Sequence, residues 1–133
     1  MNYFRWTARI LSILAIMFVS MFAFDSFEMP TLKEQLIAFA IHLIPSYILA
    51  AILYVAWRWE LIGGIIYILI ALGVSPWIFK HNYAMNHSIS MSLGIIGMIT
   101  FPFVVSGSFF LTSYIMHQKA LKNALASDDS KPI

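Results

Sequence analysis

The chain lacks cysteine and has few charged residues. None of its 133 residues is cysteine, and Asp, Glu, Lys and Arg together make up 11%. The lack of cysteine excludes disulfides, thiolate nucleophiles and sulfur-ligated metal sites, so the redox compartment cannot be inferred from thiols. The formal charge of +2 is too small, and the basic residues are too scattered, to indicate a nucleic-acid partner.

Apolar residues fill most of the remaining positions. Hydrophobic residues account for 61% of the chain and aromatic residues for 16%, whereas charged residues alone make up about a quarter of a soluble domain. This composition predicts an integral membrane protein, whose first partner is the lipid bilayer. Little sequence lies outside the apolar stretches, which leaves no room for a soluble catalytic module.

Four apolar runs are long enough to cross a bilayer, which takes about 20 helical residues. They cover approximately residues 6–24, 36–57, 61–79 and 89–116. Because the runs are continuous rather than alternating, they favour helices over the strands of a membrane barrel. The sequence therefore predicts an all-α bundle of four transmembrane helices, with one domain at residues 1–126 and a polar tail at residues 127–133. We expect the fourth helix to continue beyond its apolar run, through His117 to Lys122.

The first apolar run follows basic residues, as in a secretory signal peptide. A cleavage site needs two small residues spaced two apart at the end of the apolar region. Ala23 lies there, but the residue two positions before it is Met21. We therefore expect the first helix to be retained.

Basic residues fall mainly on one side of the membrane if all four helices span it. Arg5, Arg9, Arg58, Lys119 and Lys122 lie on this side, and Lys33 and Lys80 lie on the other. In membrane proteins the cytoplasmic loops carry the excess of Lys and Arg. We therefore expect both termini and the central turn in the cytoplasm, in a multi-pass protein of the bacterial inner (cytoplasmic) membrane.

The segment AWRWELIGG, residues 56–64, carries two charges between the second and third runs. Arg58 closes one predicted helix and Glu60 opens the next, which matches the negative and positive ends of the two helix dipoles. Trp57 and Trp59 suit the headgroup level of the bilayer. The pattern favours an interfacial helical hairpin. The alternative is that Arg58 or Glu60 takes part in a proton or substrate path.

Each apolar run also carries a line of small or polar residues, which in lipid marks the side that packs against protein. The lines are Arg9, Ser12 and Ser20; His42, Ser46, Ala50 and Tyr54; Glu60, Gly64, Tyr67, Ala71 and Ser75; and Ser90, Gly94, Gly97 and Ser108. We expect these lines to face the inside of the bundle. The candidate helix-packing residues are Ser46, Gly63, Gly64, Gly94 and Gly97.

Three segments resemble a family of small, uncharacterised bacterial membrane proteins. They are RWTARILSIL near the start, IHLIPSYIL in the second run and AWRWELIGGIIYILIAL across the turn. The shared motifs are Trp-basic-Trp-Glu-x-x-Gly-Gly at the turn and His-x-x-Pro before it, and the resemblance covers about residues 5–72. It implies a four-span topology and no assigned activity.

His42 is the residue within the runs whose chemistry could matter most, because imidazole titrates near neutrality. Pro45 leaves the carbonyl of Ile41 without its helical partner, so His42 could hydrogen-bond across the bundle and help to satisfy the broken helix. The alternatives are a proton relay or an axial ligand to haem. Haem ligation by two histidines fits poorly, because His81 and His87 fall in a predicted loop.

We expect a non-enzymatic accessory or scaffold subunit that acts through helix contacts with another membrane protein or with itself. Beyond His42 there is no acid–base pair, nucleophile or metal-ligand set, and no cofactor or metal is expected. The competing hypotheses are a small transporter or proton-coupled channel centred on His42 and a haem-binding redox subunit. Helix-packing glycines in excess of what four helices use among themselves favour a partner.

Overall fold

The computed structural model describes residues 3–130, and it is 95% helical with no strand in that range. Its elements are α1 (Tyr3–Met21), the 3₁₀ helix η1 (Phe22–Glu28), α2 (Leu32–Arg58), α3 (Glu60–Asn86) and α4 (Ile89–Asp129). Four segments are long and apolar enough to cross a membrane, namely α1 together with η1, and each of the other three helices. The prediction of an all-α protein with four candidate spans is confirmed.

Side-chain caps set where two of the helices begin. The Thr31 hydroxyl accepts a hydrogen bond of 3.3 Å from the backbone N–H of Glu34, which is half of a capping box. The Ser88 hydroxyl caps α4 in the same way, accepting from the N–H of Met91 at 3.3 Å. Because of its cap, α2 starts at Leu32 rather than near residue 36, and it includes charged residues that precede the apolar run.

The link between α2 and α3 consists of one residue. Trp59 has φ −134° and ψ 88°, and it separates Arg58 at the end of α2 from Glu60 at the start of α3. Its N–H donates to the carbonyl of Val55 at 2.7 Å, and its carbonyl accepts from the N–H of Gly63 at 2.9 Å. Both helix ends therefore keep backbone hydrogen bonds while the chain reverses direction.

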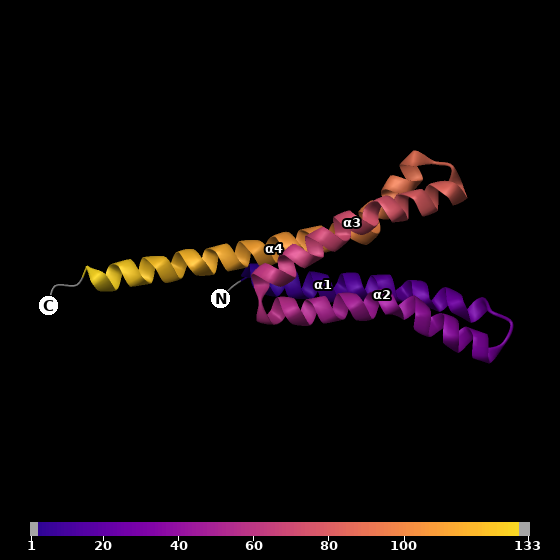
Figure 1. Cartoon of the computed structure of the whole chain (residues 1–133), viewed down its shortest axis with the longest axis horizontal. Helices are drawn as coiled ribbons and strands as arrows, with labels where there is room; N and C mark the ends of the chain where they lie inside the picture. Colours follow the sequence, from indigo (N-terminus) through magenta and orange to yellow (C-terminus); the bar gives the residue numbers. More distant parts are fainter. Residues whose placement is uncertain (1–2, 131–133) are drawn as a thin grey trace.

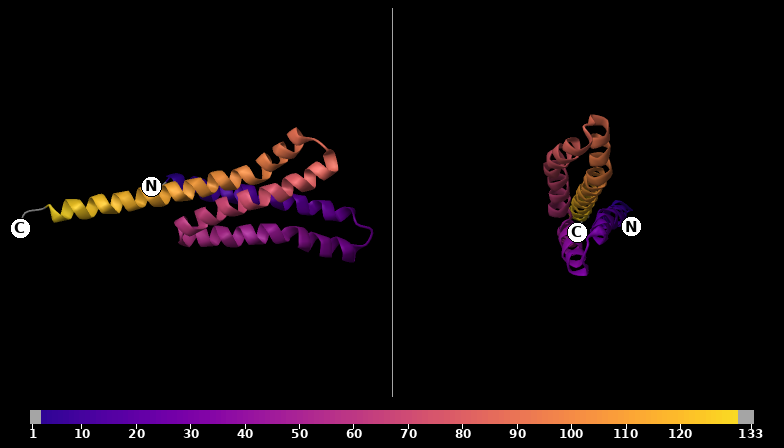
Figure 2. Two further views of the ribbon diagram at one scale, coloured as in Figure 1. Left: turned by 45° about the horizontal axis from the view of Figure 1, so that its top comes forward. Right: turned by 90° about the vertical axis from the view of Figure 1, so that its right-hand side faces the viewer.

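The helices pair as two hairpins, α1 with α2 and α3 with α4, as Figures 1 and 2 show. The hairpins meet at the end that holds the α2–α3 turn, here called the turn end. They diverge toward the end that holds η1 and the α3–α4 link, here called the loop end (Figure 1). Contacts between the hairpins are made by α4 with α1 and by α3 with α2.

Side-chain hydrogen bonds join helices both within each hairpin and between the two hairpins. Within the hairpins, Ser20 donates to Ser46 at 2.9 Å and Ser75 donates to Thr100 at 3.3 Å. Between the hairpins, the fully buried Tyr67 hydroxyl donates to the carbonyl of Leu49 at 3.1 Å. Tyr67 and Leu49 both lie in the half of their helices nearer the turn, so this hydrogen bond fastens the hairpins where they are already close.

The helix α4 is much longer than a membrane span. Its 41 residues correspond to about 60 Å at 1.5 Å per residue, which is about twice the thickness of a hydrocarbon core. Figure 1 shows its C-terminal part running past the other helices at the turn end. The predicted extension through His117 and Lys122 is present. The helix also includes residues 127–129 of the predicted polar tail, and residues 131–133 lie outside the described part.

The residues predicted to face the inside of the bundle do so on some helices and not on others. On α3, Glu60, Gly64, Tyr67 and Ala71 are buried and Ser75 is half-buried, and on α1 Ser12 is buried. On α2 the prediction was wrong for His42, Ala50 and Tyr54, which are exposed, and the buried residues are Ser46, Leu49, Ile52, Leu53 and Ala56. On α4 it was wrong for Ser90, Gly94, Gly97 and Ser108, which are exposed, and the buried residues are Ser92, Thr100, Phe103, Ser106, Gly107, Phe110 and Ser113.

Candidate functional site

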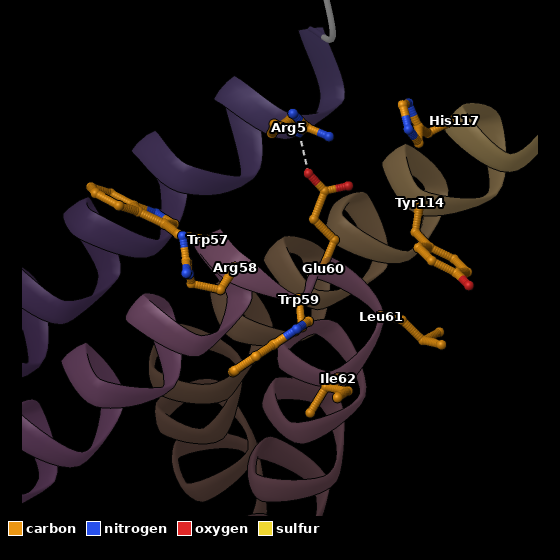
Figure 3. A pocket seen from close by; sticks show the side chains of 9 residues that line it. All are labelled: Arg5, Trp57, Arg58, Trp59, Glu60, Leu61, Ile62, Tyr114 and His117. Atoms are coloured by element: carbon orange, nitrogen blue, oxygen red, sulfur yellow. Dashed lines mark ion pairs between the residues drawn. The ribbon is translucent and has the colours of Figure 1, made fainter. Parts of the chain in front are cut away.

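The charged residues of the turn line a cavity at the turn end. The cavity has a volume of about 430 Å³ and draws its walls from α1, α2, α3 and α4. Its lining residues are Arg5, Trp57, Arg58, Trp59, Glu60, Leu61, Ile62, Tyr114 and His117. Figure 3 shows them around the start of α3. The α2–α3 turn is thus one wall of a pocket, here called the turn pocket, which is completed by residues more than 50 positions away.

An ion pair crosses the turn pocket from α1 to α3. The Arg5 side chain is 33% exposed and pairs with the Glu60 carboxylate, whose residue is only 9% exposed (Figure 3). The attraction to Arg5 and the positive end of the α3 dipole both offset the cost of removing the Glu60 carboxylate from water. Arg58 in the last turn of α2 and Glu60 in the first turn of α3 match the charge order of the predicted hairpin. The partner Arg5 was not predicted.

Arg9 occupies the neighbouring turn of α1 and contacts two tryptophan rings. Its guanidinium carbon lies 5.5 Å from the ring centroid of Trp6 and 5.1 Å from that of Trp57. Both distances fall within the range of cation–π attraction. The guanidinium of Arg9 is therefore held between α1 and the end of α2, which adds a second link between the N-terminal helix and the turn.

Arg58 and two side chains of α4 complete the polar lining of the turn pocket. Arg58 lies at the end of α2 and has no ion-pair partner among residues 3–130. His117 lies on α4, and Figure 3 shows it with Tyr114 on the side of the pocket toward which the second carboxylate oxygen of Glu60 points. The pocket thus offers one guanidinium without an ion-pair partner in the described part of the chain, one imidazole and one phenol.

A second cavity lies between the two hairpins, where they begin to diverge. Its volume is about 570 Å³, and it is here called the cleft. The lining residues are Val19, Pro45, Ile48, Leu49, Tyr67, Ile70, Ala71, Gly73, Val74, Trp77, Ile78, Ile99, Thr100 and Phe103. All four helices contribute, and nearly all of these side chains are apolar. The cleft therefore suits an apolar occupant such as a lipid chain or a helix, rather than a polar solute.

His42 does not line either cavity. Its side chain is exposed, and its Nδ1 lies 2.7 Å from the carbonyl oxygen of Ala38, one turn earlier in the same helix. The predicted inward position and hydrogen bond across the bundle are therefore corrected, because the side chain is exposed and its Nδ1 bonds its own helix instead. His81 and His87 are exposed near the loop end, while His117 lies in the turn pocket. Within residues 3–130, no group of three His, Asp or Glu side chains could hold a metal ion.

The candidate packing residues divide into two groups. A Cβ at Gly63 would overlap Ala56 across the α2–α3 turn, and one at Gly64 would lie 2.9 Å from the carbonyl oxygen of Gly107 on α4. Ser46 is buried and accepts a hydrogen bond from Ser20. These residues lie where helices meet closely. Gly107 meets Gly64 backbone to backbone, and it was not among the predicted packing residues. Ser106 and Ser108 place small residues on the neighbouring faces of α4 as well, so residue size does not single out the face that packs.

Gly94 and Gly97 form the second group. Neither has any atom within 4 Å of the position that a Cβ would occupy, and both are exposed. Gly73, which lines the cleft, also has no atom within 4 Å of its Cβ position. The prediction that Gly94 and Gly97 pack inside this chain's own bundle is wrong, because α4 turns its Thr100 and Phe103 side inward instead.

Comparison with known proteins identifies a family. A family model described as "Domain of unknown function (DUF7670)" matches residues 1–122. The match extends well beyond residues 5–72, where the sequence motifs lie, and it includes most of α4. Searches of curated proteins and of solved structures gave no match.

Proposed function

Because the chain belongs to the family of domains of unknown function DUF7670, we propose a role from its own geometry: a non-enzymatic accessory or scaffold subunit that binds a transmembrane segment of another membrane protein or of a second copy. The observation that carries this proposal is a set of glycines that pack against no other helix of the described chain. Three of the six glycines, Gly73, Gly94 and Gly97, have nothing within 4 Å of a Cβ position. Glycine on a lipid-exposed helix face allows a second helix to approach closely.

The cleft supports the same proposal. Lipid tails are as apolar as leucine, so helices associate in a bilayer through close packing and hydrogen bonds rather than through apolar burial alone. A cleft whose walls include Gly73 and Ala71 offers a partner helix such close packing. The Thr100 hydroxyl in the cleft donates to the carbonyl of Ile96 and accepts from the Ser75 hydroxyl behind it, so an apolar partner leaves the Thr100 hydroxyl paired.

We also propose an orientation. The turn end carries Arg5, Arg9 and Arg58, and the extension of α4 beyond it carries Lys119 and Lys122. The excess of basic residues at this end supports a cytoplasmic location for both termini and the α2–α3 turn. The inner (cytoplasmic) membrane of a bacterium is the location that this proposal assigns to the protein.

Site-specific photocrosslinking in native membranes tests the proposed role. A photoreactive amino acid replaces Met98, near Gly94 and Gly97 on α4, or Trp77, at the cleft; a third variant carries it at Met17 on α1 as a matched exposed control. We expect a discrete protein adduct, hetero- or homo-oligomeric, from Met98 or Trp77 and none from Met17. Lipid adducts alone at all three positions, or the same protein adducts at all three, would contradict the proposal.

A further inference from the structure

The turn pocket is lined by residue types that favour the headgroup level of a bilayer. Trp57 and Trp59 line it, and Trp6 lies nearby under Arg9. Tryptophan is enriched at this level because its ring is apolar and its N–H is polar. Leu61 and Ile62 form an apolar wall of the same pocket. A ligand that fits this position has a polar head and an apolar portion that stays in lipid.

The charges of the turn pocket leave a positive excess. Arg5 and Glu60 neutralise each other, while Arg58 has no ion-pair partner among the described residues. Lys119 and Lys122 follow on the next turns of α4, which extends from the pocket. An anionic head is therefore attracted, and a cationic one is repelled.

We propose that the turn pocket binds the phosphate group of an anionic phospholipid, with Arg58 as its principal ligand. A guanidinium donates two parallel hydrogen bonds to phosphate oxygens, which a single ammonium cannot do. Basic pockets between transmembrane helices are suited to such headgroups. Tyr114 and His117 of α4 line the same cavity, on the side opposite the Arg58 guanidinium in Figure 3. Leu61 and Ile62 contact the upper part of the acyl chains.

Glu60 has a positioning role in this site. Its carboxylate pairs with the Arg5 guanidinium, which enters the same pocket from α1. Paired in this way, Arg5 contributes a fixed dipole and not a second free charge.

Lipid retention by the intact protein tests this inference. The purified full chain in mild detergent is titrated with phosphatidylglycerol or with phosphatidylcholine, and bound lipid is counted by native mass spectrometry. The wild type is expected to bind one phosphatidylglycerol more tightly than phosphatidylcholine. Arg58→Gln should weaken phosphatidylglycerol binding by about tenfold or more, as expected for a lost charge-assisted pair. Lys80→Gln, which removes a charge near the loop end, should leave binding unchanged.

Two further measurements distinguish a lipid site from a site for charge alone or for free phosphate. Arg58→Lys keeps the charge and the fold but loses the bidentate geometry, so its affinity should lie between those of the wild type and Arg58→Gln. Inorganic phosphate at millimolar concentration should not displace the lipid, because it lacks the apolar portion. Displacement by phosphate would overturn the lipid assignment. Equal loss in Arg58→Gln and Lys80→Gln, or equal binding of both lipids by the wild type, would overturn the site.

Discussion

The crossing of α3 and α4 gives the sharpest stability prediction. An alanine Cβ at position 107 would lie 2.7 Å from the carbonyl oxygen of Gly64 and 2.8 Å from the Cγ1 of Ile68. The first neighbour is backbone, so it cannot rotate away. Ordinary contact begins at 3.4 Å, and Gly107→Ala therefore requires the two helices to separate by about 0.7 Å at their closest point.

The expected cost follows from that displacement. Overpacking of a well-packed interior costs about 1–3 kcal/mol. Alanine gains about 0.5–1 kcal/mol over glycine in helix propensity, but helices largely persist in the membrane-unfolded reference state, so little of that gain counts here. Gly107→Ala should therefore lower the free energy of unfolding by ~1–3 kcal/mol. Gly97→Ala, which meets no atom within 4 Å, should change it by less than about 0.5 kcal/mol.

Unfolding of the purified protein by SDS in mixed micelles, followed by tryptophan fluorescence, measures this difference. Both variants exchange glycine for alanine in the same helix, so the comparison isolates the contact with Gly64. Equal stability of Gly107→Ala and Gly97→Ala would refute the close α3–α4 crossing. Destabilisation by Gly97→Ala alone would show that α4 faces the opposite way.

Three other perturbations follow from the structure. Glu60→Gln should lower the free energy of unfolding by about 1–3 kcal/mol, more than the roughly 0.3–1 kcal/mol of a helix-end charge alone. A double-mutant cycle with Arg5→Gln should show coupling between the two residues, and additive effects would contradict the ion pair. Tyr67→Phe should cost about 0.6–1.7 kcal/mol through its lost interhelical hydrogen bond, and an unchanged unfolding curve would argue against that bond. A cysteine at Glu28 should react with a membrane-impermeant thiol reagent in intact cells and one at Ser127 should not, whereas the reverse pattern would invert the proposed orientation.

Hydropathy and turn chemistry predict the helices of this chain but only part of their packing. The inward line of α3 could be predicted because small or polar residues repeat along one face from Glu60 to Ala71. The corresponding line on α4 could not, because small residues occur on several faces and lipid is as apolar as the bundle interior. The exposed side with Gly94 and Gly97 carries small residues just as the packed side with Ser106 and Gly107 does.

The charged site shows a different limit. The order of Arg58 and Glu60 along the chain predicts the two helix ends, since dipole effects are local. The pairing of Glu60 with Arg5 depends on how α1 approaches the turn, and no local pattern encodes that approach. His42 was assigned an inward position because polar side chains in membrane helices usually seek partners across the bundle. In the structure, its Nδ1 bonds the carbonyl of Ala38 in its own helix instead.

The central claim is that two hairpins are joined at the turn end and parted at the loop end, with the cleft between them. Because the chain has no cysteine, spin labels can be placed without removing any native thiol. One doubly labelled variant carries labels at Thr7 and Ser108, near the contact between Phe4 and Phe109, and the other carries them at Met29 and Met85. Pulsed electron paramagnetic resonance in lipid nanodiscs should give a longer distance for the loop-end pair than for the turn-end pair. A loop-end distance equal to or shorter than the turn-end distance would contradict the claim.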